Sequence, residues 1–236
     1  MLMSSQILDR GRKLQYLDLS QIISLSKRAC RSIVRRARTL YLNLFGRRIN
    51  KKKLTMLKSS PVIKLNLGSG PSCGINGWIN IDISGADINW DLRKPIHLPE
   101  NSVSSIYSSH LLEHLEFDAI NKLLLECYRL LANNGELNLC VPNARLYIDS
   151  YVSRSNLRLE SDLYSPAVAD TESFIDQLNY VAYMGGEHKY MFDESNLTFL
   201  LHKAGFVDVL VTDGSFELDD DERKCDSLYM NARKFK

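Results

Sequence analysis

A short loop of small residues is the first part of the sequence that could do chemistry. The apolar run 62–67 is followed at once by Gly68-Ser69-Gly70. Glycines directly after a strand let the backbone turn sharply and let a ligand approach where a Cβ would clash. The dinucleotide-binding fingerprint also needs a glycine at position 73, where this sequence has Cys73. The loop therefore indicates a small-molecule site, and the missing glycine argues against NAD.

An acidic residue ends the next apolar run. Asp82 lies fourteen residues after Gly68, whereas the ribose-binding acid of a dinucleotide site lies about 20 residues on. Carboxylate oxygens accept hydrogen bonds, and one carboxylate can accept from both hydroxyls of a ribose. Asp82 is therefore our candidate for holding the ribose of an adenosine.

A group of histidines could do acid–base or metal chemistry. Residues 110–114, His-Leu-Leu-Glu-His, match the H-x-x-E-H motif of one class of zinc proteases. That motif needs a helix that presents both histidines on one face and a third ligand downstream. Because His110 falls where a strand is expected to end, we predict no metal ligand. We interpret Glu113 and His114 as packing or supporting residues, with a catalytic role for His114 as the alternative.

A second histidine lies in a polar segment at residues 185–190, Gly-Gly-Glu-His-Lys-Tyr. The glycines suggest a mobile loop over a pocket. In this loop Glu187, His188 and Tyr190 could contact the substrate that accepts a transferred group. His188 is our first candidate for a general base, because the ordinary pKa of histidine lies close to neutral pH. The alternative is a surface histidine in a loop.

These residues lie among alternating strands and helices, which predict a largely parallel sheet covered on both faces. Strands are expected at 62–67, 78–83, 86–90, 103–108, 137–141, 206–212 and 227–231. Helices are expected at 116–131, 145–152, 173–184 and 193–204. The first of these helices is expected to end at Asn133-Asn134-Gly135, a natural C-cap.

Eight short stretches then match one family in order. They are LNLGSG at 65–70, GWINID at 77–82, DLR at 91–93, PENSV at 99–103, SSHLLEH at 108–114, ECYRLL at 126–131, VPN at 141–143 and HKYMFD at 188–193. Together they resemble class I, type 11-like methyltransferases that depend on S-adenosyl-L-methionine (SAM). Members of this family are often associated with bacterial surface-polysaccharide genes.

The resemblance implies a Rossmann-like α/β fold, SAM as the cofactor, and a role for each matching residue. The cofactor-binding residues that it implies are Gly68, Ser69 and Gly70 for the methionine part, Asp82 for the ribose, Asp91 and Leu92 for the adenine, and His110 for the methyl group. His110 is also a catalytic candidate because it would face that methyl group. The glycines could instead form only a tight turn, and the two acids could only cap loops.

The first connections of the expected sheet are short. About ten residues separate Gly68 from Trp78, and the next connection, 84–87, is shorter still. A parallel crossover normally needs a dozen or more residues. We therefore expect a mostly parallel central sheet with shortened first crossovers, whose first helix is reduced to about one turn. A degenerate copy of the fold that binds no cofactor is an alternative.

The charge of the chain is divided between two parts. Residues 1–58 carry fifteen basic and two acidic side chains, a net charge of +13, and the rest of the chain carries −11. Apolar residues recur at helical spacing from Ser20 to Gly46. We therefore divide the chain into a basic amphipathic helical arm with a linker, 1–58, and a methyltransferase domain, 59–236. The arm could pack on the acidic domain or a partner chain, bind an anionic membrane surface, or bind RNA.

No apolar run reaches the roughly 18 residues of a membrane span, the N-terminus lacks signal-peptide features, and the five cysteines form no C-x-x-C pair. We expect a cytoplasmic protein, with attachment to the inner membrane face through the arm. The expected reaction is in-line methyl transfer to a hydroxyl of a glycan or glycolipid precursor. The alternatives are a methyltransferase acting on RNA or protein, and a non-catalytic adaptor in a biosynthetic complex.

Overall fold

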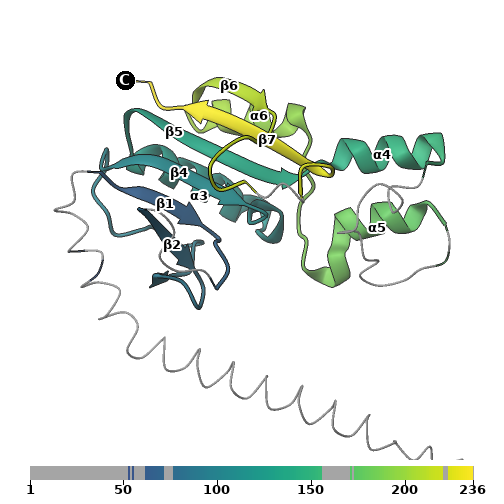
Figure 1. Cartoon of the computed structure of the whole chain (residues 1–236), viewed down its shortest axis with the longest axis horizontal. Coiled ribbons are helices and arrows are strands. Elements are labelled where there is room, and N and C mark those ends of the chain that lie inside the picture. Colours follow the sequence, from purple (N-terminus) through teal and green to yellow (C-terminus); the bar gives the residue numbers. More distant parts are fainter. Residues whose placement is uncertain are drawn as a thin grey trace, which may run out of the picture. The chain divides into compact units, whose positions relative to one another are not determined.

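Among the residues that the structure describes, seven strands form one sheet in the order β3-β2-β1-β4-β5-β7-β6 (Figure 1). The strands are β1 Lys64–Leu67, β2 Trp78–Asp82, β3 Ile88–Asn89, β4 Val103–Ser109, β5 Leu131–Pro142, β6 Val207–Thr212 and β7 Ser227–Arg233. The first five pair in parallel, and β7 is antiparallel to both β5 and β6. The prediction of a mostly parallel α/β sheet is confirmed.

This computed structural model describes residues 53, 55, 62–71, 77–155, 171, 173–219 and 223–235. All of them belong to one compact unit, Gly46–Lys236. The predicted basic helix lies outside the described residues, so the arm and the boundary after residue 58 stay predictions.

The described helices flank the sheet and its carboxyl end. They are α3 Phe117–Leu130, α4 Ala144–Ser153, α5 Ile175–Tyr183 and α6 Glu194–Lys203, with the short 3₁₀ helices η2 Leu112–His114 and η4 Met184–Gly186. α3 packs with α6 and β5, while α4 and α5 pack together beyond the end of β5 (Figure 1). None of these described helices combines the length and the apolar character that crossing a membrane requires.

The core lies between α3, α6 and one face of the sheet. β1 points Leu65 and Leu67 into it, and both side chains are at most 1% exposed. α3 contributes a buried stripe at helical spacing, formed by Ile120, Leu123, Leu124 and Cys127. Burying each such leucine stabilises the fold by roughly 1.5–3 kcal/mol, and this packing fixes the position of the strand ends.

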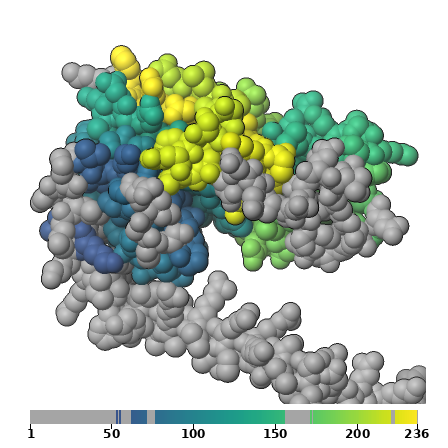
Figure 2. Space-filling view, in the orientation of Figure 1, coloured from purple at the N-terminus to yellow at the C-terminus, as the bar shows by residue number. Residues whose placement is uncertain are grey.

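The opposite face of the sheet is covered by the segment between β6 and β7. Phe216 stacks on Tyr107 of β4 at 5.3 Å and meets Trp78 of β2 edge-on at 5.6 Å. The Trp78 indole donates a hydrogen bond to Glu217 (2.6 Å), and the Tyr107 hydroxyl donates to Asp219 (2.9 Å). Figure 2 shows the yellow-green atoms of the β6–β7 segment on the face turned to the viewer. These contacts on β2 and β4 therefore come from a segment far along the chain.

One predicted helix end is wrong. α3 ends at Leu130 and the chain enters β5 at once, rather than continuing to Asn133-Asn134-Gly135. Asn134 does adopt a left-handed conformation, with φ 62°, but it lies in an irregularity of β5. Val103 pairs with Leu131 and Ser105 pairs with Glu136, so the extra residues bulge out of the ladder.

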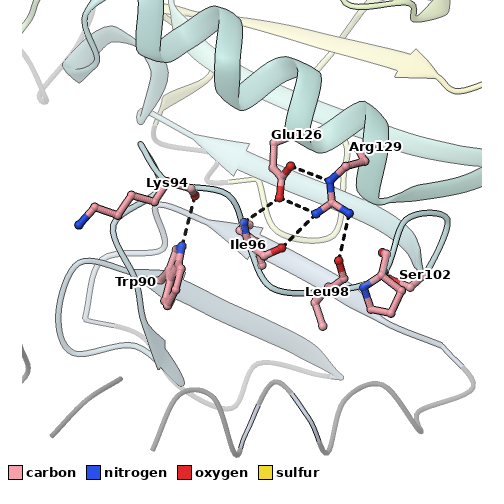
Figure 3. Close-up of polar contacts among 8 residues, drawn as sticks. Trp90, Lys94, Ile96, Leu98, Ser102, Glu126 and Arg129 are labelled. Carbon is pink, nitrogen blue, oxygen red and sulfur yellow. Dashed lines mark hydrogen bonds and ion pairs between the residues drawn. The ribbon is translucent and has the colours of Figure 1, made fainter. Parts of the chain in front are cut away.

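A charged pair on α3 fastens the loop that leads from β3 to β4 (Figure 3). Glu126 accepts a hydrogen bond from the Ile96 backbone N–H (2.7 Å), and Arg129 donates to the Ile96 and Leu98 carbonyls (3.0 and 3.1 Å). Arg129 also donates to both carboxylate oxygens of Glu126, at 2.8 and 2.7 Å. This loop is therefore fixed to α3 through its backbone, although it has no regular structure of its own.

Candidate functional site

A cleft of about 750 Å³ opens at the carboxyl ends of β1 and β4. The chain builds outward from β1 to β3 and then returns to β4 on the other side of β1. Neighbouring strands that diverge in this way form a topological switch point, where open α/β sheets bind their ligands. The volume lies within the roughly 300–1,000 Å³ that is typical of small-molecule sites.

The glycine loop lines this cleft, as predicted for Gly68, Ser69 and Gly70. Gly68 and Gly70 have φ values of 72° and 64°, in the left-handed region that favours glycine. A Cβ on Gly68 would lie 2.7 Å from the Cβ of Leu111, so close packing excludes a side chain there. A Cβ on Gly70 would meet no described atom within 4 Å, because this residue faces open space.

Asp82 holds the loop from the end of β2. Its Oδ2 accepts a hydrogen bond from the Gly70 backbone N–H (2.9 Å), and its Oδ1 accepts from the Ile83 N–H (2.5 Å). A carboxylate has about four acceptor positions, so each oxygen can accept a further hydrogen bond. Asp82 does not line the cleft within the described part of the chain, and its contact with a ribose stays a prediction.

The two residues proposed to flank an adenine have other partners. Asp91 accepts hydrogen bonds from the Arg93 side chain at 2.8 and 3.1 Å. These bonds hold the pKa of the Asp91 carboxyl below its usual range. Leu92 is 7% exposed and packs in the core. Neither residue is part of the described cleft lining, so their adenine contact also stays a prediction.

His110 lies in the cleft directly after β4, with its ring fixed on both sides. Its Nε2 is 2.9 Å from the Ser227 hydroxyl, and its Nδ1 is 3.2 Å from Oε1 of Glu113. Burial opposes the charged form of the ring, but the contacts with Cys140 and Glu113 outweigh burial and raise the pKa of His110 to about 9. A protonated His110 donates through both ring nitrogens and has no lone pair with which to accept a proton.

The backbone of His110 confirms that the zinc-protease pattern lacks its helix. Its φ is 49°, and η2 begins only at Leu112. His110 and His114 therefore do not share one face of a helix.

His188 is a buried residue of the cleft, which excludes the alternative of a surface histidine. It is 7% exposed, and its Nδ1 lies 2.7 Å from the Val181 carbonyl oxygen. Burial lowers the pKa of His188 below its ordinary value. Its ring meets the ring of His114 edge-on, with the centroids 4.9 Å apart.

A backbone contact brings these two histidines together. The Glu113 carbonyl accepts hydrogen bonds from the N–H groups of Lys189 (2.7 Å) and Tyr190 (3.3 Å). The segment 188–190 is thereby tied to η2, seventy-odd residues earlier in the chain. The Glu113 side chain is 1% exposed and points into the same region.

Several residues of the cleft could not be found by sequence reasoning. Tyr147, Tyr180, Arg223 and Asp226 all line it, and the Tyr147 hydroxyl donates to Asp226 at 3.2 Å. A tyrosine on an amphipathic helix gives the same signal as a core residue, and no motif surrounds Asp226. The proposed acceptor contacts divide: Glu187 and His188 line the cleft.

Tyr190, the third proposed acceptor contact, is not among the described residues that line the cleft. It packs instead between Phe117, at 5.2 Å, and Phe192, at 5.1 Å.

Comparison with known proteins gives a family match and distant structural likenesses. Residues 79–139, about a quarter of the chain, match a family model described as "Methyltransferase domain". A SAM-dependent methyltransferase from Archaeoglobus fulgidus is 15% identical, with a TM-score of 0.47, 81% of this chain covered and 94% of that chain. A SAM-dependent methyltransferase from Mesorhizobium loti is 16% identical, with a TM-score of 0.44 and coverage of 77% and 96%.

A third similar structure is the 1,6-didemethyltoxoflavin-N1-methyltransferase of Burkholderia thailandensis, with 1,6-didemethyltoxoflavin and S-adenosylhomocysteine bound. It is 16% identical, with a TM-score of 0.45 and coverage of 98% of this chain and 99% of that chain. A search of curated proteins gives no match.

Proposed function

We propose that this protein is a SAM-dependent methyltransferase that methylates a hydroxyl of a glycan or glycolipid precursor. The observation that carries the proposal is the cleft at the β1–β4 switch point, whose walls include both the glycine loop and three histidines. The match of residues 79–139 to a methyltransferase domain supports the reaction class. The hydroxyl acceptor is inferred from the histidines.

The residues around the glycine loop fit a nucleoside cofactor. Gly70 leaves open the space that a Cβ would fill. Asp82 fixes this loop and keeps acceptor capacity on both oxygens for hydroxyl donors. The site also lies at the strand ends where the fold places ligands. These features together support SAM as the cofactor.

When bound, SAM supplies an electrophilic methyl group on a positively charged sulfur. The contribution of the chain is to hold the acceptor in line with that group, and alignment of two reactants can supply roughly 7–11 kcal/mol of a barrier. The fixed ring of His110 is suited to such positioning, because Ser227 and Glu113 hold its two nitrogens. His110 and Glu113 both line the cleft, and Ser227 contacts His110 from β7.

His188 remains our candidate for the general base. Its Nδ1 faces a carbonyl oxygen, which only accepts, so the proton is on Nδ1 and the lone pair is on Nε2. A sugar hydroxyl is a poor nucleophile near neutral pH, and an imidazole lone pair can take its proton as the new bond forms. His114 is the second candidate, since it lies against His188.

The rest of the lining supports a polar acceptor. Arg223 and Asp226 supply charged groups, and Tyr147 and Tyr180 supply aromatic rings with hydroxyls. Such groups are able to bind the several hydroxyls of a sugar. A membrane location for the acceptor would suit the +13 charge of residues 1–58, and we propose that this segment attaches the protein to an anionic membrane.

The first test is isothermal titration of the full chain with S-adenosylhomocysteine. We expect micromolar binding that Asp82→Ala weakens at least tenfold, while Asp118→Ala, at an exposed position on α3, leaves the affinity unchanged. If the folded wild-type protein does not bind S-adenosylhomocysteine, the proposed methyltransferase activity is wrong and the non-catalytic adaptor is favoured.

The acceptor class is tested next with SAM that carries a labelled methyl group. Lipid-linked sugars, total RNA and protein extracts are offered separately to the full chain. Transfer of label to the lipid-linked sugars is the expected result. Transfer to RNA or protein instead would contradict the proposed acceptor and leave the methyltransferase intact.

A further inference from the structure

Three side chains with metal-binding atoms meet in the cleft. They are Glu113 and His114 of η2 and His188, which follows η4. One donor atom from each lies within 4.8 Å of the other two. The backbone hydrogen bonds between Glu113 and residues 189 and 190 hold the two segments together. The cluster is therefore built into the fold and does not depend on the chance position of one side chain.

Both histidines have their lone pairs directed away from the backbone. Nδ1 of His188 lies 2.7 Å from the Val181 carbonyl oxygen, and Nδ1 of His114 lies 3.2 Å from the Glu187 carbonyl oxygen. Because a carbonyl oxygen only accepts, each Nδ1 carries the proton and each Nε2 carries the lone pair. Metal-binding histidines typically donate their second ring N–H to a carbonyl or carboxylate in this way, which fixes the tautomer and the ring.

The Glu113 carboxylate supports a cation at this point. It is 1% exposed, and its Oε2 accepts no hydrogen bond from any residue that the structure describes. Its Oε1 pairs with His110 Nδ1 at 3.2 Å and lies 4.0 Å from His114 Nε2. Buried carboxylates are normally hydrogen-bonded, paired, or bound to a metal.

We propose that Glu113, His114 and His188 bind a divalent first-row transition metal ion through one carboxylate oxygen and two Nε2 atoms. Two imidazoles and one carboxylate are the protein ligands of several catalytic zinc and iron sites, whereas magnesium prefers oxygen ligands alone. Zinc ligands at about 2.0–2.2 Å from the ion lie roughly 3–3.5 Å from one another. The side chains therefore need to approach by about 1 Å.

This ligand set differs from the one in the zinc-protease motif that the sequence matches. That motif would use His110 and His114 from one helix face, a geometry that the structure does not have. His188 takes the place of His110, because the chain folds back onto η2. The sequence predicted no metal ligand because His110 and His114 do not share a helix face, and nothing in the spacing of the sequence indicates that His188 lies beside His114.

The open coordination positions of such an ion would face the cleft. A role for the ion in activating the acceptor hydroxyl rests on the proposed function. An acceptor hydroxyl that binds an open position becomes a stronger acid, because the cation stabilises the alkoxide. With the ion bound, the lone pair of His188 would be a ligand and could not accept a proton. The ion would lower the pKa of the bound hydroxyl, and the hydroxyl proton would pass to solvent water as the oxygen takes the methyl group.

The test is a metal titration of the full chain after chelator treatment, without any cofactor. Zn²⁺ binding is measured by calorimetry, and Co²⁺ binding by its visible absorption. We expect one equivalent of either ion to bind, with no competition from Mg²⁺. Glu113→Gln, His114→Gln and His188→Gln should each weaken binding by at least about 100-fold, since even changes behind the ligands cost roughly 10–100-fold.

Matched controls come from the same chain. His97→Gln and His202→Gln remove the two exposed histidines, and Cys225→Ser removes an exposed thiol. These three variants should bind within twofold of the wild type. The ion should also raise the melting temperature of the wild type but not of Glu113→Gln. That variant should fold without metal, because it removes a buried charge and keeps the side-chain shape.

Two results would overturn the metal site: no binding by the folded wild type, or binding that the controls abolish and the three ligand variants do not. S-adenosylhomocysteine binding separates this failure from failure of the proposed function. Protein that binds S-adenosylhomocysteine but no metal keeps the function and loses the metal site. Protein that binds metal but no S-adenosylhomocysteine keeps the metal site and contradicts the proposed function.

Discussion

Gly68 and Gly70 both have positive φ values, but they need glycine for different reasons. At Gly68 a side chain would collide with Leu111, so the residue serves the packing of η2 against β1. At Gly70 a side chain would meet no atom of the described residues within 4 Å. Gly68 therefore serves the fold, and we propose that Gly70 leaves room for the ligand.

Alanine substitutions should separate these two roles. Gly70→Ala should cost about 1–2 kcal/mol of unfolding free energy for its left-handed backbone and should weaken S-adenosylhomocysteine binding at least tenfold. Gly68→Ala should cost about 1–3 kcal/mol more, because its Cβ also overpacks Leu111. Urea unfolding and calorimetry measure the two effects. Wild-type affinity in Gly70→Ala would show that the ligand does not approach this residue.

The sequence predicts residues whose role is local better than residues that meet across the fold. A helix was predicted to begin at residue 193, and in the structure Asp193 is the N-cap of α6 and forms a full capping box with Asn196. All the residues that form this helix cap lie within four consecutive positions, 193–196, so the sequence alone can indicate it. In contrast, the contact of His188 with His114 depends on how two distant segments pack. No spacing in the sequence reveals the contact of His188 with His114. The same is true of the contact of Tyr147 with Asp226.

At the scale of elements, α3 does more than cover the sheet. Its last turn provides Glu126 and Arg129, which satisfy the backbone of the loop between β3 and β4 (Figure 3). Asp91 and Leu92 belong to this loop. α3 therefore fixes the part of the loop that follows the proposed adenine-binding residues, although no described residue of α3 lines the cleft.

Arg129→Ala should lower the unfolding free energy by about 1–3 kcal/mol, because it leaves the Ile96 and Leu98 carbonyls and the Glu126 carboxylate short of donors. Urea denaturation gives the value. Arg145→Ala breaks a far more exposed ion pair with Asp149 and should leave stability unchanged within error. Equal effects of the two variants would show that the Arg129 contacts contribute nothing specific.

The β6–β7 segment is the second element with a structural role that the sequence did not indicate. Phe216→Ala should cost about 1–3 kcal/mol, less than the 3–5 kcal/mol of a fully buried phenylalanine, because Phe216 is only partly buried. Phe199→Ala, on α6 and 66% exposed, is the matched control and should change stability little. A neutral Phe216→Ala, again by urea denaturation, would mean that the segment does not protect the sheet.

At the scale of the whole molecule, the sequence predicted the fold class well because alternating strands and helices leave few possible sheets. The shortened first crossovers were also predicted, from the number of residues alone. The sequence did not predict that the β6–β7 segment covers the sheet face opposite α3 and α6, since this segment lies more than 130 residues after β2. Proximity of that kind is a property of the folded chain.

The division of charge gives a prediction for the full chain. Vesicles that contain anionic lipid should bind it, and binding should fall steeply as salt is added, because each basic residue near such a surface contributes about 1 kcal/mol. Removal of residues 1–58 should abolish vesicle binding and leave the affinity for S-adenosylhomocysteine within twofold. Co-sedimentation with anionic and neutral vesicles measures this. Salt-sensitive binding to RNA but not to vesicles would contradict the membrane role.

The position of β7 has a consequence for how the protein is made. β7 follows β6 along the chain but lies between β5 and β6 in the sheet, so β6 has no hydrogen-bonding neighbour when it leaves the ribosome. A domain generally folds as a unit, so the sheet is completed only when β7 has been made. Asp226, which lines the cleft, and Ser227, which contacts His110, are made together with this strand. A nascent chain that stalls before β7 would therefore lack both the hydrogen-bonding neighbour of β6 and two residues of the ligand site.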